Sequence, residues 1–225
     1  QQKALEEVQE QFAQKNTVLL QGVAASGKTL LYSQLIEQTL AQGKNVLYLV
    51  PEVGLSVQLM NRLEHFFGDK MSVYHGKYSS HERVEVWNNV LANKPKAQFV
   101  LGVRAAVCLP FHDLGLIIVD EEHDLSYKQE QTPPRFQVRD TALMLAHLHG
   151  AKALLGSATP SAESYANAQA GKYGFVQLLE RYTGIQAPTI ELVDLKEKTK
   201  KKETQGHLNF QVYQVFYPKA WPLIG

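Results

Sequence analysis

The stretch Gly22-Val-Ala-Ala-Ser-Gly-Lys-Thr29 decides how this chain of 225 residues is expected to fold. The apolar run 17–21 before it predicts a buried strand, and the residues from Leu30 onward have helical spacing. A strand, then G-x-x-x-x-G-K-T, then a helix is the context of a phosphate-binding loop. Its glycines let successive backbone N–H groups point at an anion, and the start of the helix adds positive partial charge. A glycine-rich turn that matches by chance is the alternative.

The polar side chains of this loop predict nucleotide chemistry. Lys28 is expected to reach the β- and γ-phosphates of a nucleotide, and the Thr29 hydroxyl is expected to bind Mg²⁺. Gly22, Ser26 and Gly27 are expected to surround the phosphates. The loop therefore predicts a nucleotide-binding protein.

The composition narrows the class of protein. Hydrophobic residues make up 44% and charged residues 20% of the chain, as in an ordinary globular protein. The net charge of +1 gives no overall signal for nucleic acid, so any basic surface must be local. The single cysteine, Cys108, excludes an internal disulfide or a multi-cysteine zinc site and fits a reducing compartment. His75, His81 and His112 are too scattered to predict a metal site.

The lack of a long apolar run and the residues at the start of the chain lead to two expectations. No apolar run approaches the roughly 18 residues of a membrane span, so no membrane association is expected. The chain begins Gln-Gln-Lys-Ala without an initiator Met or a signal peptide, and we expect it to be a piece of a longer protein.

Strands and helices are predicted to alternate as far as residue 169. The predicted strands are 17–21, 46–50, 71–75, 99–102, 116–119 and 153–156, and the predicted helices are 1–14, 28–42, 55–67, 79–93, 138–149 and 161–169. The strands are apolar on both faces, which is typical of a parallel sheet covered by helices on both sides. The predicted fold class is therefore α/β, with one mostly parallel sheet.

The pattern changes beyond residue 171. A strand at 173–179 is predicted either to add to the sheet antiparallel or to lead out of the domain, and a second strand is predicted at 189–193. The segment 196–203 holds five lysines in eight residues, which suits a solvated linker, with a nucleic-acid contact as the alternative. The predicted domains are 1–180, a strand and basic linker at 181–204, and an unassigned tail at 205–225.

Two carboxylates follow the strand predicted at 116–119. In such a sheet the carboxyl ends of the strands open toward the ligand, so Asp120 and Glu121 are expected beside the nucleotide. Asp120 is expected to hold Mg²⁺, and Glu121 to orient and deprotonate the attacking water. An acidic exit from a strand into a loop is the alternative.

Small hydroxyl residues follow the next predicted strand. Ser157 and Thr159 could connect the γ-phosphate site to a neighbouring surface. Taken alone, the segment is a strand-to-helix turn in which Ser161 caps the following helix.

The ordered set GVAASGKT, DEEH and GSAT resembles the first motor lobe of the superfamily 2 helicases. Segments 50–58 and 102–106 resemble two nucleic-acid-contacting motifs of that superfamily. The sequence DEEHD-x-SYKQ, with the aromatic and basic loop that continues to Arg139, is similar to the bacterial primosomal replication-restart helicases. The similarity extends from the N-terminus to about residue 195.

The resemblance implies a RecA-like P-loop NTPase lobe of an ATP- and Mg²⁺-dependent 3′-to-5′ DNA helicase that acts at stalled forks. Carried over by position, it implies a catalytic role for Lys28, Asp120 and Glu121, coupling to movement by His123, Ser157 and Thr159, and adenine recognition by Gln2. The DNA-contacting residues that it implies are Ser56, Gln58, Arg104, Tyr127, Lys128, Arg135, Phe136 and Arg139.

The residue types of the loop 124–139 agree with contact to single-stranded DNA. Tyr127 and Phe136 offer faces for base stacking, worth about 1–3 kcal/mol per base, and three cations offer charge for phosphates. The alternative is that Phe136 packs under the next helix. For Arg104 the alternative is an arginine that faces solvent.

The resemblance also implies partners and limits. Single-stranded and forked DNA are the expected ligands, with replication-restart proteins and single-stranded DNA-binding protein as partners of a longer bacterial, cytoplasmic protein. Its zinc-binding segment and the second lobe, which supplies an arginine finger, would lie outside this chain. Because such a finger is worth about 10³–10⁵ in rate, the isolated lobe is expected to be nearly inactive. The alternative functions are a double-stranded DNA translocase or remodeller, a P-loop kinase and a nucleotide-binding scaffold.

Overall fold

The computed structural model describes residues 2–179, except 53, 55, 77, 131 and 132, together with the backbone of 204–205 and 208–209. The chain divides into two compact units, 1–185 and 186–225. In the second unit, β10 (Thr204–Gln205) and β11 (Leu208–Asn209) pair antiparallel. The strand predicted at 189–193 and the lysine-rich segment lie outside the described residues, and the domain boundaries stay a prediction.

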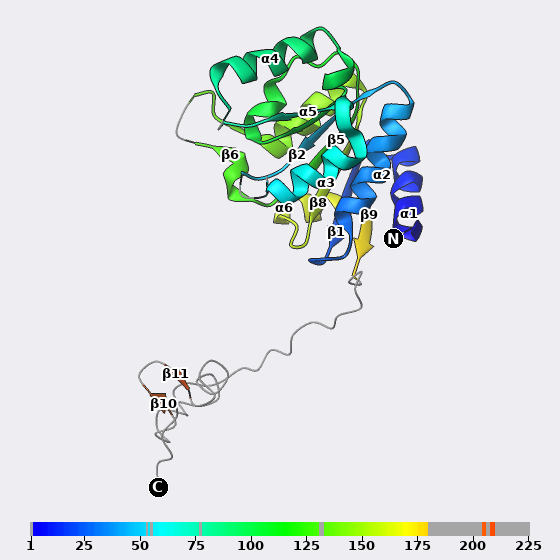
Figure 1. Ribbon diagram of the computed structural model, residues 1–225. Helices are drawn as coiled ribbons and strands as arrows, with labels where there is room; N and C mark the ends of the chain where they lie inside the picture. Colours follow the sequence, from blue (N-terminus) through cyan, green and yellow to red (C-terminus); the bar gives the residue numbers. More distant parts are fainter. Residues whose placement is uncertain are drawn as a thin grey trace. The chain divides into compact units, whose positions relative to one another are not determined.

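A parallel sheet of seven strands forms the centre of the first unit (Figure 1). Its spatial order is β3-β4-β2-β5-β8-β1-β9. The strands are β1 (Thr17–Gly22), β2 (Asn45–Leu49), β3 (Met71–Tyr74), β4 (Phe99–Gly102), β5 (Leu114–Asp120), β8 (Lys152–Ser157) and β9 (Gly174–Leu178). The six strands predicted up to residue 156 and the α/β fold class are confirmed.

Strand β9 corrects one expectation. It pairs with β1 in parallel, with Val18 opposite Gly174, so an antiparallel addition is wrong. A helix lies between β8 and β9, and a helical crossover returns the chain in the same direction as the strand it left.

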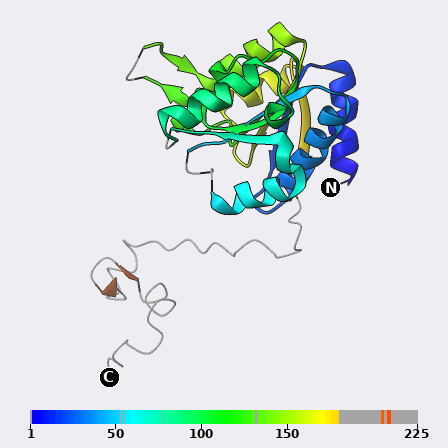
Figure 2. The ribbon, with the colours of Figure 1, turned by 45° about the horizontal axis from the view of Figure 1, so that its top comes forward.

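Helices cover both faces of the sheet (Figure 2). They are α1 (Gln2–Gln14), α2 (Lys28–Ala41), α3 (Val57–Phe67), α4 (Ser80–Leu91), α5 (Val138–His149) and α6 (Ala162–Gln169). Short 3₁₀ helices are η1 (Gly68–Lys70), η2 (Pro95–Ala97), η3 (Arg104–Cys108) and η4 (Leu125–Tyr127). No helix of the described residues is long and apolar enough to cross a bilayer.

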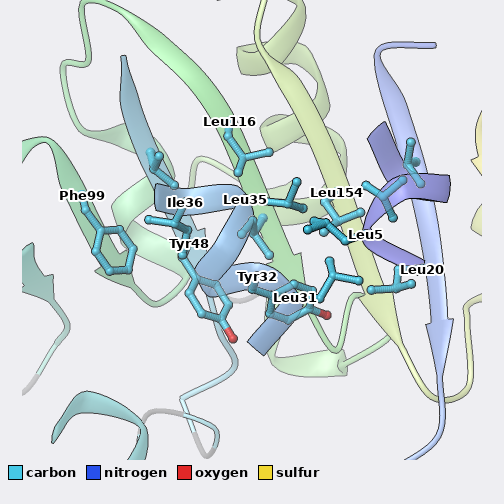
Figure 3. Packing of buried hydrophobic residues seen from close by; sticks show 14 of the residues in the cluster. Leu5, Leu20, Leu31, Tyr32, Leu35, Ile36, Tyr48, Phe99, Leu116 and Leu154 are labelled. Carbon is cyan, nitrogen blue, oxygen red and sulfur yellow. The ribbon is translucent and has the colours of Figure 1, made fainter. Parts of the chain in front are cut away.

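The strands supply two separate cores because alternate side chains point to opposite faces. Val18 and Leu20 of β1 belong to one hydrophobic cluster with side chains of α1, α2 and α3, part of which Figure 3 shows from close by. Leu19, between them, belongs to a second cluster, here called the second core, together with side chains of α4, α5 and α6. The carboxyl ends of β1, β5 and β8 therefore meet at one edge of a sheet that is held on both faces.

Candidate functional site

The loop between β1 and α2 encloses one side of a cavity of about 510 Å³. Gly27 has φ 91° and Ala25 has φ 60°, so the chain passes through left-handed conformations just before α2 begins. The cavity is lined by Val23, Ala24, Ala25, Ser26, Gly27, Lys28, Thr29, Leu30, Arg62, Asp120 and Glu121. The structure thus brings the loop and the two carboxylates together, as the sequence predicted.

Lys28 is the central cation of this cavity. Its Nζ donates to the carbonyl oxygen of Gly22 at 2.9 Å and forms an ion pair with Glu121 Oε1 at 3.3 Å. Only 11% of its side chain is exposed. Lys28 therefore places an ammonium group in the lining of the cavity, between the loop backbone and Glu121.

Asp120 ends β5 in an enclosed environment. Its Oδ1 accepts hydrogen bonds from the Tyr32 hydroxyl at 2.9 Å and from the Glu121 N–H at 3.1 Å. Its Oδ2 accepts from the Tyr48 hydroxyl at 3.1 Å. Burial raises the pKa of Asp120 and the charge of Glu121 adds to the effect, whereas Lys28 and the two hydroxyls oppose it.

Glu121 differs from its neighbour in exposure and backbone conformation. Its side chain is 37% exposed and lines the cavity. Its φ of 47° is left-handed, a conformation that costs on the order of 1–3 kcal/mol for a residue with a Cβ. The Asp124 N–H, which donates to the Glu121 carbonyl at 2.8 Å, helps to hold this turn. Both carboxylates line the cavity, and the strained turn places the enclosed one of Asp120 beside the more exposed one of Glu121.

The three residues predicted to couple hydrolysis to movement are in contact. His123 Nδ1 lies 2.7 Å from the hydroxyl of Ser157, which is buried. The other ring nitrogen lies 3.4 Å from the hydroxyl of Thr159, and Nδ1 lies 3.8 Å from Glu121. The end of β8 is therefore connected through His123 to a carboxylate of the cavity.

A buried network around Glu122 was not predicted from the sequence. Its side chain is fully buried, and it accepts from the Ser161 N–H at 2.6 Å and from the Ser161 and Ser164 hydroxyls at 3.0 and 2.8 Å. Arg139 Nη1 completes the shell at 3.4 Å. Ser161 caps α6, as the sequence predicted. The two serines of S-A-E-S, three residues apart at a helix start, were the one signal that could have suggested a buried acceptor.

This network corrects the prediction that Arg139 contacts DNA. Only 11% of its side chain is exposed, and it is bonded to Glu122, to Asp140 at 2.9 Å and to Ser161 at 2.7 Å. The guanidinium is needed to neutralise a carboxylate that has no access to water. Its Nη1 is therefore directed to the buried carboxylate of Glu122, whereas its Nε bonds to the exposed Asp140.

Tyr127 requires the same correction. It is 1% exposed, and its hydroxyl donates to the Asp120 carbonyl oxygen at 2.8 Å. The apolar ring packs in the second core beside Val138 and leaves no face for a base. Tyr127 therefore fastens the start of the loop to the end of β5.

The remainder of the loop forms a short hairpin of β6 (Lys128–Gln129) and β7 (Phe136–Gln137). Lys128 and Arg135 are exposed, and the hairpin residues line a groove of about 540 Å³. Phe136 is partly buried against the second core, which agrees with the alternative that it packs within the protein. The described part of the loop thus keeps two of its three predicted cations on the surface.

The other predicted contacts lie apart from the cavity lining. Arg104 Nη1 donates to the Ser126 carbonyl at 3.1 Å, Ser56 caps α3, and Gln58 is exposed on that helix. Gln2 is exposed on α1 and bonds to Glu6 at 3.2 Å. It is not among the residues that line the cavity.

The donor set suits magnesium better than a softer metal. Among the described residues, no three His, Cys, Asp or Glu side chains gather as a metal site. The oxygens of Thr29 and Asp120, with phosphate and water, are the hard ligands that Mg²⁺ takes in nucleotide sites.

Comparison with known proteins decides the family. Residues 1–168 match the DEAD/DEAH box helicase family. The chain belongs to this family. Family membership indicates nucleotide use, with ATP and typically Mg²⁺.

The chain is also similar to curated replication restart proteins named PriA. It is 42% identical to the Bacillus subtilis protein over 180 residues, which are 80% of this chain and 22% of that protein. It is 43% identical to the Chlamydia trachomatis protein over 198 residues, 87% of this chain and 26% of that protein. The chain thus spans about a quarter of the length of these relatives.

Solved structures support the fold alone. RecG bound to a three-way DNA junction matches 79% of this helicase-family chain with a TM-score of 0.54 at 20% identity, over 23% of its own length. The helicase MrfA bound to DNA matches 80% of the chain with a TM-score of 0.55 at 19% identity, over 25% of its own length.

Proposed function

We propose that this chain is the ATP-binding lobe of a DNA-dependent ATPase and 3′-to-5′ DNA helicase that acts in replication restart. The observation that carries the proposal is the single cavity in which Lys28, Thr29, Asp120 and Glu121 meet. The similarity to the PriA proteins supports the role in replication restart. The proposed partners are single-stranded and forked DNA and, through a longer protein of the bacterial cytoplasm, replication-restart proteins and single-stranded DNA-binding protein.

Each residue of the cavity has a proposed task. Thr29 and Asp120 would hold Mg²⁺, which supplies charge stabilisation to the phosphates when it is bound. Lys28, now paired with Glu121 at 3.3 Å, would exchange that carboxylate for phosphate oxygens. Glu121, released and exposed to the cavity, would accept the proton of the attacking water. We propose no zinc site on this chain.

DNA contact is proposed for the hairpin and not for the whole predicted loop. Lys128 and Arg135 are exposed there, and the partly buried Phe136 lies beside them in the groove. Positive charge next to an aromatic edge suits a single strand. Ser56, Gln58 and Arg104 remain proposed contacts. We do not propose Tyr127, which is buried, or Arg139, whose side chain is 11% exposed and bonded within the protein.

The test is ATP turnover with and without single-stranded DNA. Two proteins are needed: this chain alone, and a chimera in which it replaces the matching segment of the Bacillus subtilis relative. We expect the chain alone to bind ATP but to hydrolyse it about 10³–10⁵ times more slowly than the chimera, because an arginine finger from a second lobe is missing. Lys28→Ala should abolish DNA-stimulated turnover in the chimera, and Lys3→Ala, at an exposed position of α1, should leave it unchanged.

Three outcomes separate this function from the alternatives. Rapid DNA-stimulated turnover by the chain alone would contradict the assignment as a lobe. A chimera that hydrolyses ATP but separates no strands in a displacement assay would indicate a double-stranded DNA translocase. A chimera whose ATP turnover changes neither on addition of DNA nor on the substitution Glu121→Gln would indicate a nucleotide-binding scaffold.

A further inference from the structure

Two buried tyrosines outside the recognised motifs converge on Asp120. Tyr32 lies in α2 and Tyr48 in β2, and neither side chain has any exposed surface. Their rings meet edge to face, with centroids 5.5 Å apart, and both hydroxyl oxygens lie at the same end of the cluster in Figure 3. Each hydroxyl donates to a different oxygen of Asp120. Both oxygens of this carboxylate are thus tied to tyrosines that the core holds in place.

The two hydroxyls are suited to act as donors. Burial raises the pKa of Tyr32 and of Tyr48 well above the ordinary value for tyrosine, and the nearby charge of Asp120 adds to the effect. A protonated phenol beside a carboxylate oxygen donates a charge-assisted hydrogen bond.

Gly156 makes the approach of Tyr32 possible. A Cβ at this position would lie 1.8 Å from the Tyr32 hydroxyl oxygen and 3.2 Å from Asp120 Oδ1. Position 156 therefore requires glycine, because the Tyr32 side chain lies too close to the backbone there for a Cβ. Three elements, α2, β2 and the end of β8, thus contribute to the position of one carboxylate.

We propose that Tyr32 and Tyr48 are positioning residues that fix the orientation of the Asp120 carboxylate for magnesium, with Gly156 providing the space for Tyr32. The proposal rests on the proposed function, in which Asp120 holds the ion. A carboxylate that accepts a hydrogen bond on each oxygen cannot rotate freely about its Cβ–Cγ bond. Its remaining lone pairs keep one direction before the nucleotide arrives, which is the effect that outer partners have on metal ligands.

The test measures the affinity for a fluorescent ATP analogue, once with saturating Mg²⁺ and once with EDTA. The ratio of the two affinities is the magnesium gain. Tyr32→Phe and Tyr48→Phe remove only the hydroxyls and keep the rings in the core. Tyr173→Phe is the matched control, because its hydroxyl bonds to Asn167, away from the cavity.

We expect each of the two variants to lower the magnesium gain by about 10-fold, and the double variant to lower it further. The affinity in EDTA should stay at the wild-type value, since the phosphate loop is intact. The control should keep the wild-type gain. A gain that survives in the double variant, or an equal loss of affinity with Mg²⁺ and with EDTA, would overturn the proposal alone. A wild-type chain with no magnesium gain would overturn the proposed function as well.

Gly156→Ala gives an independent test through a double-mutant cycle. In the wild-type background the added methyl group collides with the Tyr32 hydroxyl, and we expect it to lower the magnesium gain. In the Tyr32→Phe background that oxygen is absent, so the same substitution should have a smaller effect. Equal effects in the two backgrounds would overturn the role given to Gly156 and Tyr32.

Discussion

The nucleotide cavity and the β6–β7 hairpin hold similar charged residues in opposite ways. In the cavity, Lys28 is 11% exposed and its ammonium is bonded to Gly22 and Glu121. On the hairpin, the Lys128 side chain is 59% exposed and pairs with a neighbour in the chain, Glu130. A charge that is itself buried and has fixed partners suits a small ligand of defined shape, whereas exposed charges suit a long, flexible polyanion.

The border between these regions runs through the loop 124–139. Tyr127 and Arg139, at its two ends, belong to the buried region, because one bonds to the Asp120 backbone and the other to Glu122. The hairpin between them carries the exposed cations. The loop is therefore anchored at both ends to the end of β5 and the turn that follows it, where the carboxylates proposed as catalytic lie.

Breaking the contact between Arg139 and the buried Glu122 should have the largest effect, and that effect should be on stability. Arg139→Ala leaves the Glu122 carboxylate buried without its cation, and such a loss costs about 3–5 kcal/mol. We expect a fall in melting temperature of about 6–20 °C, measured by thermal unfolding. Arg135→Ala, the same substitution on the exposed hairpin, is the control and should change it little. An Arg139→Ala variant that keeps its stability but binds DNA more weakly would instead support the prediction from sequence that Arg139 contacts DNA.

Removing the central cation should have the next largest effect. Lys28→Ala deletes the ammonium that we assign to the phosphates, and a charged hydrogen bond of this kind is worth about 10- to 100-fold in affinity. The measurement is titration with a fluorescent ATP analogue. Wild-type affinity in this variant would exclude the cavity as the nucleotide site.

Removing the hairpin charges should weaken DNA binding moderately. For Lys128→Ala combined with Arg135→Ala, we expect affinity for single-stranded DNA to fall by about 10-fold. The slope of log affinity against log salt should fall by about 0.7 for each cation removed. An unchanged slope would show that these cations do not contact phosphates. Lys3→Ala, on α1, provides a control for the loss of one exposed charge.

Neutralising Asp120 should have the smallest effect, and it should stabilise the fold. Burial raises the pKa of Asp120, so the folded chain holds this proton more tightly than the unfolded chain does. The free energy of unfolding therefore falls as the pH rises from the unfolded pKa, about 3.9, to the raised folded value. Above that window Asp120→Asn should raise the melting temperature, by about 2–4 °C for each kcal/mol relieved.

The sign of this prediction can be checked against pH. The difference between Asp120→Asn and the wild type should shrink below about pH 4, where the wild-type carboxyl is protonated in both states. Asp113→Asn, at an exposed position, should change the melting temperature little at any pH. A lower melting temperature for Asp120→Asn at neutral pH would contradict the conclusion that the buried charge of Asp120 destabilises the fold.

Local patterns were enough to predict the strands of the central sheet, the six α-helices and the loop between β1 and α2. Gly27, Lys28 and Thr29 are adjacent, and each strand is apolar on both faces, so short windows carry the signal. The direction of β9 was not predictable in this way, since it depends on the crossover through α6. Neighbouring residues were also enough to place Asp120 and Glu121 at the carboxyl end of β5.

The buried partners of the site were not predictable, because they are distant in sequence. Tyr32 bonds to a carboxylate 88 residues away, and Arg139 bonds to one 17 residues away. Tyr127 stands directly before Lys128, so its sequence context indicated an exposed aromatic residue. Its hydroxyl is instead satisfied by a backbone carbonyl, which no side-chain pattern reveals.

The most direct test of the separation between cavity and hairpin crosses the two ligands with the two sets of variants. Affinity for the ATP analogue and, without nucleotide, for single-stranded DNA is measured on wild type, Lys28→Ala, and Lys128→Ala with Arg135→Ala. We predict that Lys28→Ala weakens only nucleotide binding and that the hairpin variant weakens only DNA binding. A Lys28→Ala variant that loses as much DNA affinity as the hairpin variant would contradict two separate regions.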